Sequence, residues 1–128
     1  MTNGPAGDLR RPRSVYGVGA EPDPRFSMAN ERTALSWLRT ALAVVAGGVG
    51  LTSVARLAGM SRLVDVVAGA LCLLGALLAV AAVTGWRRRE RAMRLDRPLP
   101  APTVLPWLGA AVAVAALALA VDVVVQAR

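Results

Sequence analysis

The sequence of 128 residues contains no histidine, no lysine and a single cysteine, Cys72. Without histidine, neither a Ser-His nor a Cys-His nucleophilic pair can form, and the commonest side-chain ligand of metals is missing. One cysteine cannot form an intrachain disulfide. We therefore expect a protein that is not an enzyme and that holds no cofactor and no metal.

Charged and aromatic residues are also scarce, at 18% and 4%, whereas 55% of the residues are apolar. Soluble domains usually carry about 25% charged residues. The charges lie almost wholly outside three uncharged blocks of 16, 21 and 24 residues, which are 40–55, 66–86 and 98–121. Because about 20 apolar residues cross the hydrocarbon of a bilayer, the sequence predicts an all-α integral membrane protein with three transmembrane helices, near 35–55, 66–86 and 104–121.

The first predicted span has the shortest uncharged block. Its 16 residues, at ~1.5 Å each, cover only ~24 Å, whereas the hydrocarbon is ~30 Å thick. The apolar flank from Leu35 to Leu38 can complete the span, and this carries Arg39 below the level of the headgroups. Ser27 can cap the following turn, so we expect the helix to begin near Met28.

The segments outside the spans differ in composition. Residues 1–24 are rich in glycine and proline and poor in apolar residues, which predicts a disordered cytoplasmic tail. Residues 25–128 form the three-helix membrane domain. No breaker follows the second span, so we expect its helix to continue for about two turns, with Glu90 and Arg94 pairing at i,i+4, until Pro98 ends it. A basic cytoplasmic connection then covers 87–103.

The arginines predict the orientation in the membrane. Six lie in residues 1–39 and six in 87–97. The opposite side carries only Arg56, Arg62 and Arg128. The positive-inside rule therefore places the N-terminus and the second connection in the cytoplasm and the C-terminus outside. The three tryptophans would all lie at this cytoplasmic interface, and the chain is predicted to be a multi-pass protein of the cytoplasmic (inner) membrane.

Polar and small side chains of the first span share one side of the helix, within about 80° on a helical projection. This stripe consists of Arg32, Ser36, Arg39, Ala43, Gly47 and Gly50. Arg32, Ser36 and Arg39 are candidates for binding anions or lining a pore, because an ionisable group at membrane depth usually faces protein or water. The alternative is that Arg39 only snorkels to the headgroups.

Small residues at a spacing of four allow helices to approach closely in lipid. Ala43, Gly47 and Gly50 are the candidates for such helix contacts. A single three-helix protomer has few ways to shield Asn30, Glu31 and Arg39, so we expect a homo-oligomer, or a hetero-oligomer with a similar small membrane subunit, in which the first helices face inward.

Acidic residues are placed at the ends of the spans. We expect Asp65 and Asp122 to pair with Arg56 and Arg62 at the outer end. No span carries a carboxylate near its middle, where a proton-coupled transporter normally has one. The sequence therefore disfavours coupled transport.

A basic patch follows the second span, with Arg87, Arg91 and Arg94 at i, i+4 and i+7. Membrane orientation and contact with the lipid bilayer explain this patch. No aromatic residues interleave with these arginines and no nucleic-acid motif surrounds them, so nucleic acid is not an expected partner. A docking site for polyanions is the alternative interpretation.

Residues 23–42, which read DPRFSMANERTALSWLRTAL, resemble the opening of the bacterial YidH-like family, a domain of unknown function found in small inner-membrane proteins. The residues of the signature are Asn30, Glu31, Arg32, Thr33 and Trp37. The stretches 48–51 and 87–100 also match, so the resemblance covers about residues 20–125. It implies a small membrane protein without a settled activity.

A more distant similarity is to the membrane domain of the eukaryotic vacuolar transporter chaperone complex, whose three-helix units assemble around a pore for polyphosphate. This resemblance implies that Arg32 and Arg39 line a path for phosphate-rich anions. The chain has no polyphosphate-synthesising domain, so it is not expected to be the polymerase. We expect a small oligomeric membrane protein that provides a passive anion pathway or binding vestibule. The alternative is a non-conducting accessory or scaffold subunit of a membrane complex.

Overall fold

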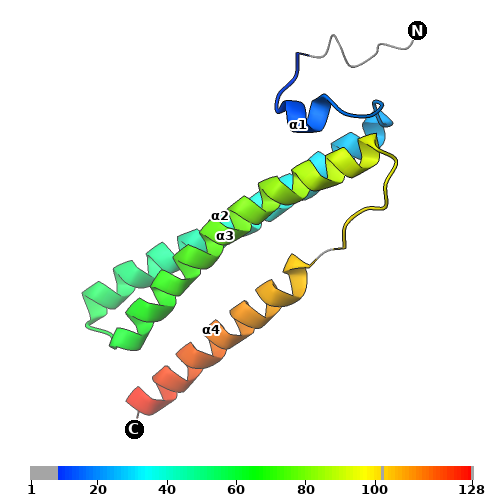
Figure 1. The fold of residues 1–128 in the computed structure, drawn as a ribbon. Coiled ribbons are helices and arrows are strands. Elements are labelled where there is room, and N and C mark those ends of the chain that lie inside the picture. The colour runs from blue at the N-terminus through cyan, green and yellow to red at the C-terminus, as the bar shows by residue number, and fades with distance from the viewer. Residues whose placement is uncertain (1–8, 102, 128) are drawn as a thin grey trace. The chain divides into compact units, whose positions relative to one another are not determined.

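The structure, a computed structural model, describes residues 9–101 and 103–127, and within these ranges the regular elements are all helices (Figure 1). They are α1 (Arg13–Tyr16), α2 (Pro24–Ala58), α3 (Arg62–Arg94) and α4 (Val104–Gln126). The helices α2, α3 and α4 are each long and apolar enough to cross a membrane. The predicted all-α fold class with three spanning helices is thereby confirmed.

The two longest helices exceed the thickness of the hydrocarbon. With 35 and 33 residues, α2 and α3 are each about 50 Å long, against about 30 Å of hydrocarbon. Part of each helix must therefore lie outside the hydrocarbon. The continuation of the second helix beyond its apolar block is confirmed, because α3 ends at Arg94, before Pro98.

The start of α2 differs from the prediction that Ser27 caps a helix beginning near Met28. The helix begins at Pro24, and the backbone N–H of Arg25 donates to Oδ1 of Asp23 at 2.9 Å. Aspartate is a preferred N-cap residue. Proline suits the first helical position because its φ is already helical and because an N–H at this position would have no partner within the helix. Ser27 lies one turn further on, where its hydroxyl donates a hydrogen bond to Glu90.

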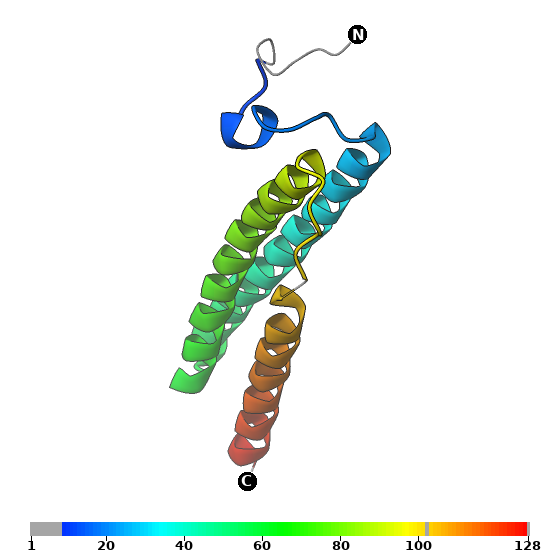
Figure 2. The same ribbon diagram turned by 45° about the vertical axis from the view of Figure 1, so that its right-hand side comes forward.

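Two units divide the described chain. The first comprises residues 9–38 and 80–101, and the second comprises residues 39–79 and 103–127. In each unit a part of α2 and a part of α3 run side by side in opposite directions (Figures 1 and 2).

In the second unit, small residues set the distance between α2 and α3. A methyl group at Gly48 would stand 2.7 Å from Sγ of Cys72 and 2.8 Å from the carbonyl oxygen of Ala68. A methyl group at Gly75 would clash with Val45 in the same way. The helices are therefore packed backbone to backbone, the usual contact between helices in lipid.

The helix α4 has no buried residues. Asp122 accepts hydrogen bonds from the Ser61 hydroxyl at 2.9 and 3.0 Å and also from Gln126. The predicted ion pairs of Asp65 and Asp122 with Arg56 and Arg62 do not form, since neither arginine makes a salt bridge within the described residues.

The N-terminal segment also departs from the prediction of a disordered tail over 1–24. Residues 1–8 lie outside the described residues, but the following ones form α1, and Val15 is only 2% exposed. Gly19 has a φ of 62°, which suits glycine, and its Cα faces the carbonyl oxygen of Arg94 so closely that a methyl group would collide with it. The backbone N–H of Ala20 donates to this oxygen at 3.0 Å, so the segment is tied to the C-terminal end of α3.

Candidate functional site

The stripe predicted on the first span lies on the continuous helix α2. All six of its residues, Arg32, Ser36, Arg39, Ala43, Gly47 and Gly50, are exposed. The hydroxyl of Ser36 donates to the carbonyl oxygen of Arg32 at 3.0 Å, one turn back along the helix. A methyl group at Gly47 or Gly50 would meet nothing within 4 Å. The chain's own described residues thus leave this stripe uncovered.

A cluster of polar residues is buried between α2 and α3 in the first unit. Asn30 and Glu90 are only 6% and 3% exposed. The side-chain amide of Asn30 donates to the carbonyl oxygen of Trp86 and to Oε2 of Glu90, both at 3.2 Å, and Nε of Arg89 donates to Oδ1 of Asn30 at 2.8 Å. The Ser27 hydroxyl donates to Oε1 of Glu90 at 2.8 Å. This polar cluster links the two helices by side chains about 60 positions apart in sequence.

Arg94 borders this cluster and is itself 6% exposed. Its Nε lies 3.8 Å from Oε1 of Glu90, and its Nη2 lies 3.9 Å from Oε1 of Glu21. The predicted i,i+4 pair of Glu90 and Arg94 is therefore confirmed, but both contacts are longer than hydrogen bonds. Within the described residues Nε of Arg94 is buried without a hydrogen-bond partner.

The buried position of Arg94 corrects the prediction of a three-arginine basic patch. Arg87 and Arg91 are exposed, whereas Arg94 is covered. Its guanidinium lies 4.9 Å from the ring centroid of Tyr16, within the range of a cation–π interaction. An exposed docking surface at this end of α3 can include Arg87 and Arg91 but not Arg94.

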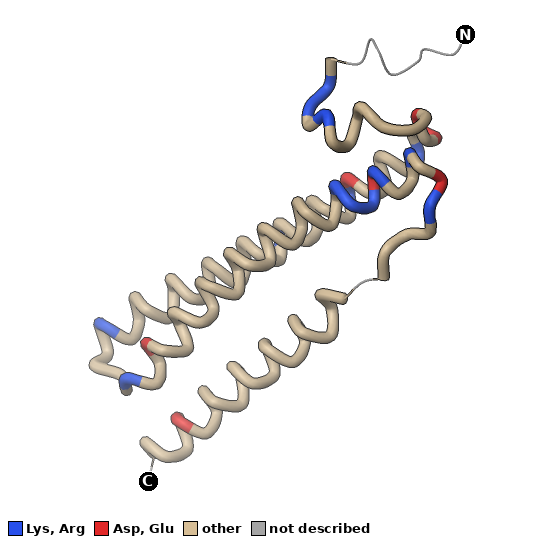
Figure 3. Tube along the Cα trace, in the orientation of Figure 1, with Lys and Arg blue, Asp and Glu red and all other residues tan. Residues whose placement is uncertain are grey.

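A groove of about 220 Å³ opens beside the polar cluster, wholly within the first unit. Its walls come from the N-terminal segment, the start of α2 and the end of α3. Figure 3 shows both acidic and basic residues at the start of α2 and at the end of α3. The charged lining residues are Arg10, Glu21, Glu31, Glu90 and Arg94. The aromatic ones are Tyr16 and Trp86, whose rings lie 6.4 Å apart at 57°.

One wall of this groove is fixed by a bidentate ion pair. Nη1 and Nη2 of Arg10 donate to the two carboxylate oxygens of Glu21 at 2.8 and 3.0 Å. The guanidinium of Arg10 also lies 4.9 Å from the ring centroid of Tyr16. The N-terminal segment, which was predicted to be disordered, therefore supplies four side chains to the groove, those of Arg10, Tyr16, Glu21 and Pro22.

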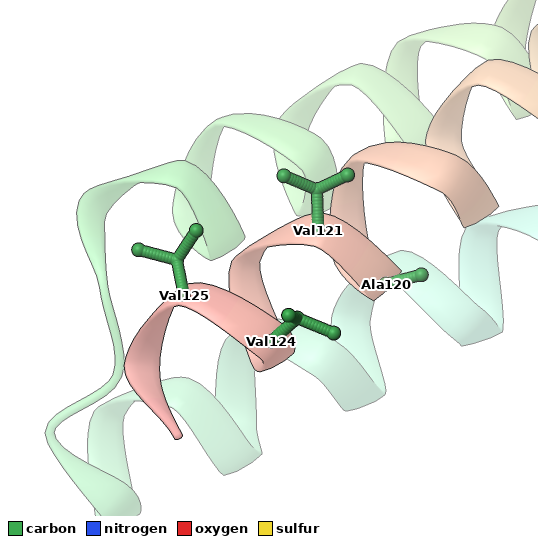
Figure 4. Close-up of a pocket in the computed structure, with 4 residues that line it drawn as sticks. All are labelled: Ala120, Val121, Val124 and Val125. Carbon is green, nitrogen blue, oxygen red and sulfur yellow. The ribbon is translucent and has the colours of Figure 1, made fainter. Parts of the chain in front are cut away.

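A second hollow, on α4, has no comparable chemistry. It measures about 340 Å³ and is lined by Ala120, Val121, Val124 and Val125, all projecting from α4 (Figure 4). None of these side chains can donate or accept a hydrogen bond. Among the described residues no group of histidine, cysteine and acidic side chains is arranged to hold a metal ion.

The predicted signature residues have different surroundings. Asn30 is buried in the polar cluster, Trp37 is half-buried, and Glu31, Arg32 and Thr33 are exposed. The contact with Glu90, which buries Asn30 within a single protomer, was not predicted from the sequence, where an oligomer was expected to shield this side chain. One signal was available, since Asn30 occurs at the helical spacing of the small residues Ala34 and Ala41, which are buried.

The three spanning helices define a helical integral membrane protein, in which the polar cluster joins two of the helices. The chain belongs to the family described as Domain of unknown function (DUF202), whose model matches residues 25–92. This range holds nearly all of α2 and α3, including Asn30, Trp86 and Glu90. The expected membership of a YidH-like family is confirmed.

Individual relatives support the same assignment. The chain is 44% identical over 86 residues to the Inner membrane protein YidH of Escherichia coli (strain K12), which covers 67% of this chain and 75% of that protein. It is 40% identical over 83 residues to the Uncharacterized protein Rv2272 of Mycobacterium tuberculosis (strain ATCC 25618 / H37Rv), which covers 62% and 66%. No solved structure matches the chain. The relationship to YidH and the three spanning helices confirm the predicted inner-membrane location.

Proposed function

We propose that the chain is a subunit of a membrane oligomer whose first helices line a passive path or binding vestibule for anions. The observation that carries this proposal is the exposure of Arg32, Ser36 and Arg39 on α2, a helix apolar enough to span the membrane. An arginine at membrane depth is costly unless it faces water or protein. The described residues of the chain leave Arg32 and Arg39 exposed.

Small residues of the same stripe support assembly through this side of α2. Ala43, Gly47 and Gly50 are exposed, and the space beside both glycines is open. Glycine and alanine let helix backbones approach closely, and the van der Waals contact that results helps to drive helix association in lipid. Packing of α2 against α2 of other copies, or of a similar small subunit, would place the arginines around a shared interior.

Phosphate-rich anions are the first candidates for the ligand. The planar guanidinium matches pairs of phosphate oxygens, and a mouth lined by arginines concentrates anions. The distant similarity to the membrane domain of the vacuolar transporter chaperone complex, which stays a prediction from the sequence, implies the same class of anion. The acidic residues of α2, α3 and α4 are near helix ends, which fits a passive path better than proton coupling.

The test is flux through liposomes that contain the purified protein. We expect chloride, phosphate or short polyphosphate to pass, and Arg39→Gln and Arg32→Gln each to reduce the flux about tenfold, the scale on which a charged mouth raises local ion concentration. Arg56→Gln is the matched control, since Arg56 is also exposed on α2 but lies outside the stripe. Flux that is absent, or equal in all three variants while oligomers persist, would refute the proposal.

A second candidate function is a non-conducting accessory subunit, and the exposure of Arg87 and Arg91 favours it. These arginines could dock a partner protein or a polyanion. The test replaces Arg87 and Arg91 together by glutamine and omits Arg94, whose substitution would disturb the buried contacts of Glu90 and Tyr16. Loss of one co-purifying partner from this variant, with no flux in the wild type, would make the scaffold the better account.

A further inference from the structure

The groove of the first unit lies at the sequence boundary between apolar and charged residues. Trp86 lines it and is the last residue of the uncharged block 66–86, and Arg87 follows directly. Tryptophan at such a boundary is typical of the membrane–water interface. We therefore expect the groove to lie at the level of the phospholipid headgroups.

Most charges around the groove are already paired within the chain. Arg10 and Glu21 form a bidentate pair, and both carboxylate oxygens of Glu90 accept hydrogen bonds from Ser27 and Asn30. These pairs hold the walls in place. Two charged lining residues, one cation and one anion, are left with hydrogen-bonding capacity that the described residues of the chain do not satisfy.

Arg94 is the cation with unmet capacity. It is buried, yet carboxylate oxygens approach it only to 3.8 and 3.9 Å, and its Nε has no acceptor within the described part of the chain. A guanidinium carries five N–H donors, and a buried charge without hydrogen bonds is costly. An acceptor with several oxygens, such as a phosphate, would satisfy it.

Glu31 is the corresponding anion. It lines the groove and is exposed, and among the residues that the structure describes it forms neither an ion pair nor a side-chain hydrogen bond. A carboxylate of this kind accepts hydrogen bonds from an ammonium group. The groove thus presents one donor-rich cation and one acceptor-rich anion.

We propose that this groove binds the headgroup of a phospholipid that carries a phosphodiester and a primary ammonium, as phosphatidylethanolamine does, with the phosphate at Arg94 and the ammonium at Glu31. The volume of about 220 Å³ suits a headgroup, since sites that enclose drug-sized ligands measure about 300–1,000 Å³. The acyl chains would remain in the bilayer.

Other headgroups fit the lining less well. Three glutamates and two arginines line the groove, so a headgroup with net negative charge meets more acid than base. A choline group cannot donate hydrogen bonds to Glu31, and it is recognised by open aromatic faces. The ring of Tyr16 is already approached by the guanidinium groups of Arg10 and Arg94. A primary ammonium avoids both difficulties.

The test measures lipid retention by native mass spectrometry on the full chain, after exchange from mild detergent into nanodiscs of phosphatidylethanolamine, phosphatidylcholine or phosphatidylglycerol. We expect retention of phosphatidylethanolamine about tenfold above the other two, the size of one charge-assisted hydrogen bond. Glu31→Gln should abolish this preference. Asp96→Asn is the matched control, because Asp96 is an exposed acid outside the groove and asparagine tolerates its φ of 52°.

Two results would overturn the proposal. One is equal retention of the three lipids by the wild type, and the other is an equal effect of Glu31→Gln and Asp96→Asn. Soluble glycerophosphoethanolamine separates a lipid site from a site for a free phosphate ester, and displacement of the lipid by this ester at matched concentration would also overturn it. The experiment involves no flux and no residue of the α2 stripe, so its outcome is independent of the anion path.

Discussion

At the scale of single residues, the buried hydrogen bond between Asn30 and Glu90 joins α2 to α3 through side chains 60 positions apart in the sequence. The sequence predicts that Glu90 pairs with Arg94, because both lie on one helix at a fixed spacing, and the structure confirms the pair. The bond between Asn30 and Glu90 was not predicted. It joins two helices, and their register depends on packing that a helical projection of one helix does not contain.

The polar cluster predicts a large effect of a nearly isosteric change. In Asn30→Asp, the amide that donates to Glu90 and to the Trp86 carbonyl oxygen becomes a carboxylate beside another carboxylate. We expect a loss of about 2–3 kcal/mol in the free energy of unfolding, the cost of buried polar groups without partners. Chemical denaturation in detergent measures this value.

Thr33→Val is the control for this substitution. Thr33 is exposed one turn further along α2, and among the residues that the structure describes its hydroxyl bonds to the Ala29 carbonyl oxygen alone. Removal of this hydroxyl should change the free energy of unfolding by no more than about 0.5 kcal/mol. Similar values for the two variants would mean that the polar cluster does not stabilise the first unit.

At the scale of helices, the three apolar blocks were sufficient to predict three helices, because only a helix satisfies its own backbone in lipid. The ends were less accurate, since α2 begins at Pro24, with Asp23 as its cap, and not near Met28 as predicted. The choice between neighbouring glycines was also beyond the sequence. Gly48 packs against α3 whereas Gly47 and Gly50 do not, and this depends on how far α2 is rotated about its axis.

Adjacent glycines allow a paired test of this packing. Gly48→Ala should destabilise the fold by about 1–3 kcal/mol, because its methyl group would press on Cys72 and Ala68. Gly47→Ala should be neutral or stabilising, since alanine favours a helix by about 1 kcal/mol over glycine. Thermal unfolding in detergent compares the two.

A larger side chain at Gly47 separates folding from assembly. Gly47→Leu should leave the protomer folded but weaken the proposed oligomer, which native mass spectrometry would show as more monomer. Leu42→Ala, on an exposed residue outside the stripe, is the control and should matter less. A wild type that is only monomeric would remove the basis for this test and for assembly through α2.

At the scale of the whole molecule, the composition predicts the membrane spans and the distribution of arginines predicts their orientation. Three spanning helices predict that the two ends of the membrane domain lie on opposite sides, and the arginine counts predict that the N-terminus is the cytoplasmic end. A C-terminal fusion to alkaline phosphatase should therefore be active, whereas a fluorescent protein at the same position should be dark. Fusions after Arg97, in the basic connection, should give the reverse result, and a C-terminal phosphatase without activity would contradict this orientation.

The polar cluster also restricts how such a protein can change during evolution. Asn30 and Glu90 lie 60 positions apart in the sequence, yet each supplies what the other lacks in a buried setting. A mutation at one position strands the other side chain without its partner, so the single mutant passes through a less stable protein. Substitutions at these two positions are therefore expected to become fixed in pairs, whereas the exposed apolar residues of α4 can change one at a time provided that they stay apolar.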